Sequence, residues 1–161
     1  MKLKTNLKRI LAFDLILVMV LSLGGCGKKD EEYVTNIQTY SNAIATESTT
    51  MTKALEEYFT SFQEPSKTKI TDSITKLEAS YNKMKTLEAP KKYTDAQVLF
   101  VEGCDLALSA LKIYKDEITA VTKATFDQSF VDRLAKGDEI MSKVNDKMVT
   151  AANKMQAIKA K

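Results

Sequence analysis

The 161-residue sequence has no histidine and no tryptophan, and it contains only two cysteines. Without histidine, haem and di-iron helical bundles lose their usual ligands. A cysteine nucleophile would also have no histidine to activate it, and no other nucleophile–base set is evident. We therefore expect no enzymatic activity, no catalytic residue, no metal site and no cofactor.

Arginine is scarce as well, because Arg133 is the only one after residue 25. The net charge of +3 comes from residues 1–25, and the rest of the chain has 20 basic and 20 acidic side chains. A nucleic-acid-binding protein needs a basic surface, and bidentate phosphate recognition needs arginine. The sequence therefore predicts no nucleic-acid partner.

Patterns typical of β-strands are also missing, since no segment alternates apolar and polar residues and no Asn-Gly hairpin signal occurs. Instead, apolar residues recur three, four and seven positions apart, which places them on one face of a helix. Four such helices are predicted, at about 31–62, 66–88, 94–122 and 126–160. The only two prolines, Pro65 and Pro90, fall between them as helix breakers.

The clearest apolar stripe belongs to the second helix and comprises Ile70, Ile74, Leu77, Tyr81, Met84 and Leu87. No single helix can hide such a stripe, and short connections make consecutive helices antiparallel. We therefore predict an all-α fold, an up-down-up-down four-helix bundle after an N-terminal signal helix. The alternative is a three-helix bundle with a broken fourth helix.

Gly137 interrupts the stripe of the fourth helix and costs about 1 kcal/mol relative to alanine. It marks either a kink with a new cap at Asp138, or a continuous helix that a neighbour approaches closely. Three helix starts carry capping signals. Asp30 is predicted to cap the first helix, and capping boxes are predicted at Thr94–Gln97 and Thr125–Gln128.

Several side chains allow a structural and a functional interpretation. Cys104 lies on an apolar stripe, where cysteine behaves as a small hydrophobic residue. A row of methionines on the fourth helix fills the core, or forms a groove or a soft-metal site: Met141, Met148 and Met155. The tyrosines suit bundle edges or line a ligand pocket. Three acidic pairs are expected to be solvated surface groups: Glu56-Glu57, Asp116-Glu117 and Asp138-Glu139.

The N-terminus has a basic start followed by 14 residues, from Ile10 to Leu23, that are apolar except for Asp14 and Ser22. A helix of that length spans about 21 Å, which is less than the bilayer core of about 30 Å. The segment ends in Leu23-Gly24-Gly25-Cys26. A basic start, a short apolar stretch and small residues together indicate an export signal.

Residues 1–27 resemble the signal of bacterial lipoprotein precursors, in which the lipobox ends in a cysteine. The resemblance implies cleavage between Gly25 and Cys26 and a diacylglycerol on the Cys26 thiol. Residues 1–25 would then be the signal peptide, 26–30 a lipidated tether and 31–161 the bundle domain. The alternatives are an uncleaved anchor or an ordinary secretory signal, with Cys26 incidental.

A lipid anchor at Cys26 predicts a location on the outer, extracytoplasmic face of the cell membrane. We predict a non-enzymatic helical module that binds another cell-envelope protein. The alternative is a small-molecule-binding or sensory bundle with a pocket between its helices. An exposed apolar patch would favour the protein partner, and a closed cavity of a few hundred Å³ would favour the small molecule.

Overall fold

The computed structural model describes residues 27–159, so the predicted signal peptide and the lipid site Cys26 lie outside the described residues. The described chain forms four long α-helices and one short 3₁₀ helix, with no strand between residues 27 and 159. Their bounds are α2 (Lys28–Ser61), α3 (Glu64–Lys85), η1 (Lys91–Tyr93), α4 (Thr94–Ala120) and α5 (Gln128–Lys159). The prediction of an all-α fold is confirmed.

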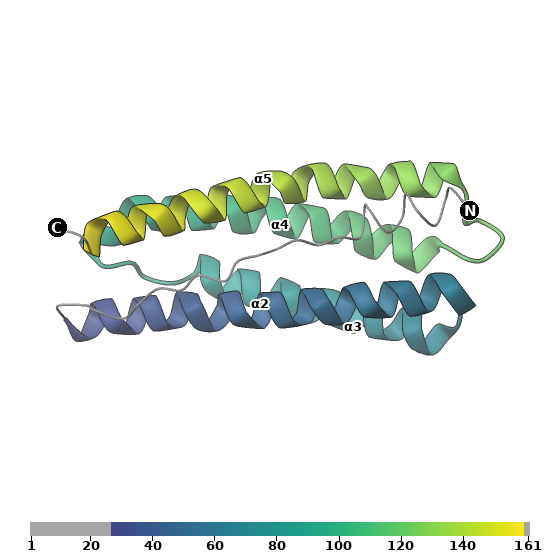
Figure 1. The fold of residues 1–161 in the computed structure, drawn as a ribbon, viewed down its shortest axis with the longest axis horizontal. Helices are drawn as coiled ribbons and strands as arrows, with labels where there is room; N and C mark the ends of the chain where they lie inside the picture. The colour runs from purple at the N-terminus through teal and green to yellow at the C-terminus, as the bar shows by residue number, and fades with distance from the viewer. Residues whose placement is uncertain (1–26, 160–161) are drawn as a thin grey trace.

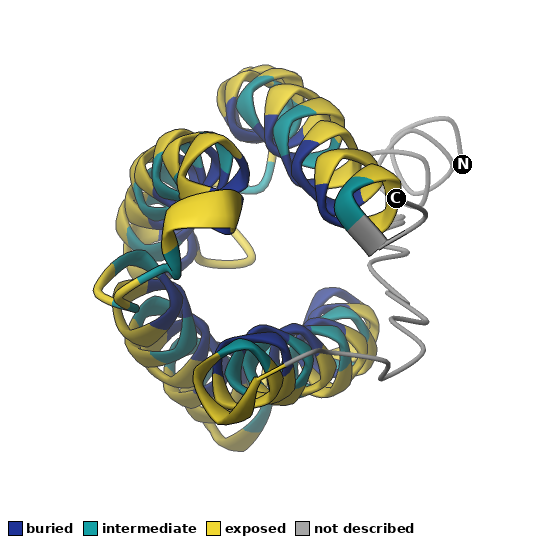
Figure 2. Ribbon diagram, turned by 90° about the vertical axis from the view of Figure 1, so that its left-hand side faces the viewer, coloured by how far each residue is buried: buried dark blue, intermediate teal, exposed yellow. Residues whose placement is uncertain are grey.

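The four helices lie lengthwise beside one another (Figure 1). α2 packs against α3, α3 against α4, and α4 against α5. Seen from one end, the buried sides of the helices face the inside of the bundle and the exposed sides face outward (Figure 2). Because α5 is one unbroken helix that packs along α4 and contacts α2 through Phe59 and Phe130, the alternative of a three-helix bundle with a broken fourth helix is wrong.

The core consists of the predicted apolar stripes. On α3 the stripe residues from Ile70 to Met84 are at most 1% exposed, and Leu87, beyond the helix end, is partly buried. The methionine row on α5 also lies in the core, since Met148 and Met155 are fully buried and Met141 is 8% exposed. The prediction that these methionines fill the core is therefore confirmed.

The helices begin and end at different residues from those predicted. α2 starts at Lys28 with Gly27 at the N-cap, so Asp30 lies within the first turn and is not the cap. The break between α2 and α3 falls at Phe62, which adopts a left-handed φ of 53°. Pro65 lies in the first turn of α3 and not between helices, because a first turn does not need the N–H that proline lacks.

Neither predicted capping box forms. The Thr94 hydroxyl donates to the Lys91 carbonyl at 3.0 Å, and Tyr93 at the N-cap of α4 makes no side-chain cap bond. The Gln97 amide instead donates to the carbonyl of Met84 at 3.3 Å. Gln97 therefore joins α4 to the end of α3, which a local capping signal cannot predict.

At the start of α5 the cap is Asp127 and not Thr125. The Asp127 carboxylate accepts a hydrogen bond from the Phe130 N–H at 3.0 Å and from the Ser129 hydroxyl at 2.8 Å. These donors lower the pKa of Asp127. Thr125 bonds to Thr122 inside the preceding turn, so the helix starts later than the sequence pattern indicated.

An aromatic cluster joins the end of α2 to the start of α5. Phe59 stacks on Phe126 with ring centroids 5.0 Å apart and contacts Phe130 at 5.5 Å. Phe62 packs edge-on to both Phe59 and Phe126. Aromatic pairs of this geometry contribute about 0.5–1.5 kcal/mol beyond area burial. The cluster therefore fastens the first and last helices at this end of the bundle.

Candidate functional site

Two surface grooves flank the connection between α3 and η1. This connection lies at the end of the bundle where α2 begins (Figure 1). The first groove has a volume of about 410 Å³ and is lined by Lys29, Glu32, Tyr33, Asn36 and residues 86–90. The second has a volume of about 340 Å³ and is lined by Ala89, Thr94, Gln97, Val98, Val101 and Glu102. Ala89 lines both grooves, so the connection forms their shared wall.

The walls of these grooves are fixed by contacts between distant parts of the chain. The Tyr33 hydroxyl of α2 donates to Gln97 of α4 at 2.6 Å, and the Tyr33 ring stacks on Tyr93 of η1 at 5.5 Å. Lys92 of η1 pairs with Asp30 of α2 at 2.7 Å. Burial raises the pKa of Tyr33, so its hydroxyl stays a donor at neutral pH.

The two grooves differ in chemistry. The first carries Lys29, Glu32, Asn36 and Glu88, which offer charges and hydrogen-bonding groups. The second is mainly apolar, and its Val98 side chain is 52% exposed. Val98 and Val149 are the two exposed large apolar side chains of the described chain. This end of the bundle therefore presents apolar surface and, a few residues away, charged and hydrogen-bonding groups.

Sequence reasoning did not identify this end as a site. α4 has two buried rows with seven-residue spacing, Phe100-Ala107-Tyr114 and Cys104-Leu111-Ile118. Val98 and Val101 lie off both rows, and this departure from the helical period is the signal that the sequence contains. The grooves also depend on Ala89, which only the packed structure places beside Val98 and Val101 of α4.

One gap in the interior of the bundle is too small to hold a ligand. This gap is lined by residues of all four long helices, including Met51, Ile74, Tyr114 and Leu134, and has no room for a water molecule. Tyr114, which lines the gap, is 3% exposed, and the core tyrosines Tyr58 and Tyr81 are each 1% exposed, so all three are packed side chains. The grooves at the end of the bundle are therefore better candidate binding sites than this gap.

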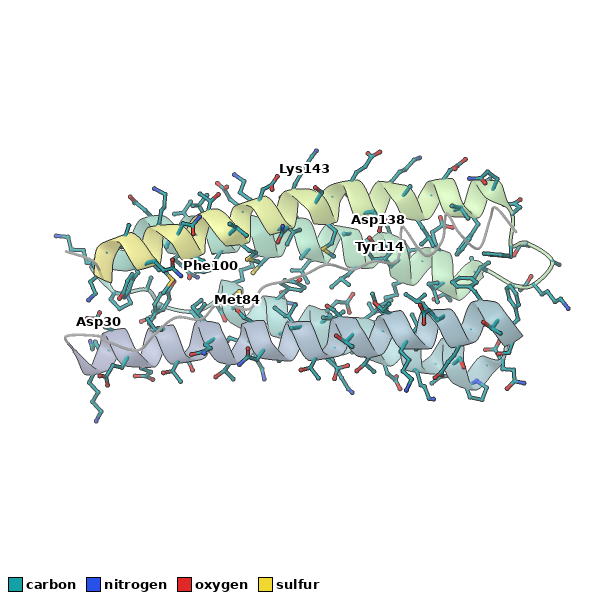
Figure 3. All side chains as sticks on the ribbon, in the orientation of Figure 1. Asp30, Met84, Phe100, Tyr114, Asp138 and Lys143 are labelled. Atoms are coloured by element: carbon teal, nitrogen blue, oxygen red, sulfur yellow. The ribbon has the colours of Figure 1, made fainter. Side chains whose placement is uncertain are left out.

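The prediction that Asp138 is a solvated surface acid is wrong. The Oδ1 atom of Asp138 accepts a hydrogen bond from Tyr114, and its Oδ2 is buried without a hydrogen-bond partner. Figure 3 shows the two side chains between α4 and α5. Burial raises the pKa of Asp138 to about 6. The signal was present in the sequence, because Asp138 lies four residues after Leu134 and three before Met141 on the stripe.

The other acidic pairs are closer to expectation. Glu56, Asp116 and Glu139 are exposed. Glu57 and Glu117 are half-buried. Glu57 pairs with Lys69 at 3.5 Å, and Glu117 pairs with Arg133 at 2.8 Å.

Within residues 27–159, no group of three or more cysteine, aspartate or glutamate side chains is arranged to hold a metal ion.

Gly137 is explained by the same contact. A Cβ atom at this position would lie 2.7 Å from Cε1 and 2.8 Å from Cζ of the Tyr114 ring. The helix continues through Gly137 without a break. Of the two interpretations of this glycine, the close approach of a neighbouring helix is confirmed.

Cys104 is fully buried on α4, as its place on the apolar stripe predicted. Burial, with a smaller effect from Asp105, raises the pKa of its thiol to about 12. Because the thiolate is the reactive form, we expect Cys104 in the native protein to react with a small thiol reagent far more slowly than a free thiol. The measurement is the labelling rate by mass spectrometry, with the urea-unfolded protein as the control. Labelling of the native protein at the free-thiol rate would contradict this expectation.

No protein-family model, curated protein or solved structure matches this chain. No helix within residues 27–159 has both the length and the apolar character needed to span a bilayer. Two features of the chain remain as indications of function: the N-terminal leader sequence and the two grooves beside the connection between α3 and η1.

Proposed function

We propose that this chain is a lipoprotein, anchored through Cys26 to the extracytoplasmic face of the cell membrane, and that its helical domain binds another envelope protein without catalysing a reaction. The N-terminal sequence supports the anchor, since a basic start and an apolar stretch lead into Leu23-Gly24-Gly25-Cys26. α2 begins at Lys28, and two extended residues reach about 7 Å. The proposed tether is therefore even shorter than 26–30, and the bundle lies next to the membrane surface.

An up-down-up-down topology is part of this proposal. Only Phe62 and Gln63 separate α2 from α3, and residues 121–127 separate α4 from α5. Each helix also packs against the next one along the chain. Short connections between neighbouring helices favour antiparallel pairs. In this arrangement the beginning of α2, the connection 86–90 and η1 share the membrane-proximal end.

The apolar groove around Val98 is the observation that carries the proposed protein partner. A half-exposed valine in a groove with Ala89 and Val101 offers apolar surface that a partner side chain can cover. The groove lies at the end where the anchor enters the bundle. Anchoring confines the protein and a membrane-bound partner to one plane and raises their effective concentration. We therefore propose a partner that presents its binding segment close to the membrane.

Small-molecule binding is the second candidate, and the first groove favours it. Its volume of about 410 Å³ lies within the range of 300–1,000 Å³ common for ligand sites. Lys29, Glu32 and Asn36 offer both charge and hydrogen bonds there. This candidate differs from the pocket between helices that the sequence suggested, because the groove is at the surface.

Site-specific photo-crosslinking in intact cells tests the protein partner. A photoreactive residue in place of Val98 is expected to give a discrete adduct with one envelope protein. The same probe in place of Val149, which is 41% exposed on α5, is the matched control and should give none. Val98→Asp should weaken co-purification of the partner by about tenfold, equivalent to about 1.4 kcal/mol. Equal adducts from both positions, or no adduct at position 98, would exclude this groove as the binding surface.

A further inference from the structure

The side chains of Tyr114 and Asp138 form a polar contact across the seam between α4 and α5 (Figure 3). The Tyr114 hydroxyl donates to Oδ1 of Asp138, while Oδ2 of the same carboxyl is buried and has no hydrogen-bond partner. The Tyr114 ring lies against Gly137, where a Cβ would come within 2.7 Å of it. The ring therefore packs closely on α5 at the glycine, and its hydroxyl is the hydrogen-bond donor to the carboxyl.

The charged groups on α3 and α4 near this contact are engaged elsewhere. Lys115, next to Tyr114 on α4, pairs with Glu78 of α3 at 3.1 Å. Glu117 of α4 accepts from Arg133 of α5 at 2.8 Å. No cation within residues 27–159 forms an ion pair with Asp138.

The remaining titratable neighbours do not supply a positive charge either. Tyr81 of α3 interacts with Tyr114, and its own hydroxyl is buried without a hydrogen-bond partner. Lys136 and Glu139, on either side of the contact along α5, are exposed. η1, which also packs against α5, contributes Lys91, Lys92 and the buried Tyr93, and Lys92 pairs with Asp30. An ionised Asp138 is thus stabilised chiefly by the Tyr114 hydroxyl.

Moving an ionised carboxylate out of water without a hydrogen-bond donor for each oxygen is unfavourable. Moving the neutral carboxylic acid out of water costs much less free energy. We propose that Asp138 and Tyr114 form a proton-dependent clamp, in which a protonated Asp138 tightens the seam between α4 and α5 and an ionised Asp138 loosens it. The proton comes from solvent and stays on the carboxyl. The Tyr114 hydroxyl keeps its own proton, because burial raises its pKa far above the neutral range.

The direction of the pH effect follows from comparing the folded and unfolded states. Burial raises the pKa of Asp138 from 3.8 to about 6. Between these two values the folded protein holds a proton that the unfolded chain has lost. The contribution of Asp138 to stability is therefore complete below about pH 3.8, decreases as the pH rises from there, and is lost by about pH 6.

Two measurements on the protein purified from membranes in detergent test the clamp. The carbon-detected NMR titration of the Asp138 carboxyl should give a pKa near 6. Asp138→Asn should raise the melting temperature relative to the wild type at pH 7.5, by about 2–4 °C, and lose this advantage at pH 4.5. Asp146→Asn, which alters an exposed carboxyl on the same helix, is the matched control and should show no such pH-dependent difference.

Tyr114→Phe separates the clamp from a merely structural role. Loss of the hydroxyl removes the donor that stabilises the ionised form, so the Asp138 pKa should rise above its wild-type value. A wild-type carboxyl that titrates near 4 would overturn the clamp. It would also be overturned if the effect of Asp138→Asn were equal at both pH values, or if Tyr114→Phe left the carboxyl titration unchanged.

Discussion

Replacing Cys26 by alanine is expected to abolish fatty-acid labelling of this protein and to leave its leader uncleaved. In the proposed processing, the thiol of Cys26 receives the diacylglycerol, and the cut between Gly25 and Cys26 follows. Without the thiol, neither step has its substrate. The measurements are incorporation of a clickable fatty acid in growing cells and the mass of the product, which should retain the 25 leader residues.

The second cysteine of the chain offers a matched control. Cys104 is the other thiol, and it is buried on α4. Cys104→Ala should therefore leave both lipid labelling and leader cleavage unchanged. Labelling that persists in Cys26→Ala, or that disappears only in Cys104→Ala, would remove the basis for the lipid anchor.

Gly137→Ala is expected to destabilise the bundle although alanine is the better helix former. The new Cβ would lie 2.7 Å and 2.8 Å from two carbon atoms of the Tyr114 ring, and an aromatic ring cannot bend away. Overpacking of this kind typically costs about 1–3 kcal/mol after helix and ring shift apart. Helix propensity offsets about 1 kcal/mol of the strain. Urea unfolding should therefore show a lower midpoint with an unchanged slope.

Gly103→Ala is the control for this prediction, because it makes the same chemical change in a different environment. Its Cβ would meet Cε of Met148 at 3.0 Å and Sδ at 3.3 Å. These atoms belong to the flexible end of a methionine, which can move to another rotamer. We expect Gly103→Ala to be neutral or stabilising by up to about 1 kcal/mol. Equal losses in both variants would mean that the Tyr114 ring is not the cause.

The helices themselves could be read from local periodicity. A stripe such as Ile70, Ile74, Leu77 and Met84 becomes buried because its spacing puts these side chains on one face. The helix ends were less predictable, because the same polar side chain can serve a cap or a distant partner. Gln97 bonds to Tyr33 and to the end of α3 instead of its own helix start, and Asp127 caps α5 in place of Thr125.

The proposed lipid anchor could be predicted from the sequence, whereas the groove and the Tyr114–Asp138 contact could not. The order of basic, apolar and small residues before Cys26 is contiguous in the chain, so the proposed anchor rests on sequence alone. The groove beside Val98 depends on Ala89 from the connection after α3, and the partial burial of Asp138 depends on Tyr114 from α4. The spacing of apolar residues determines which face of a helix is buried. Only the packing of a neighbouring helix decides whether a polar group near that side keeps its solvent, because desolvation is set by atoms far away in the sequence.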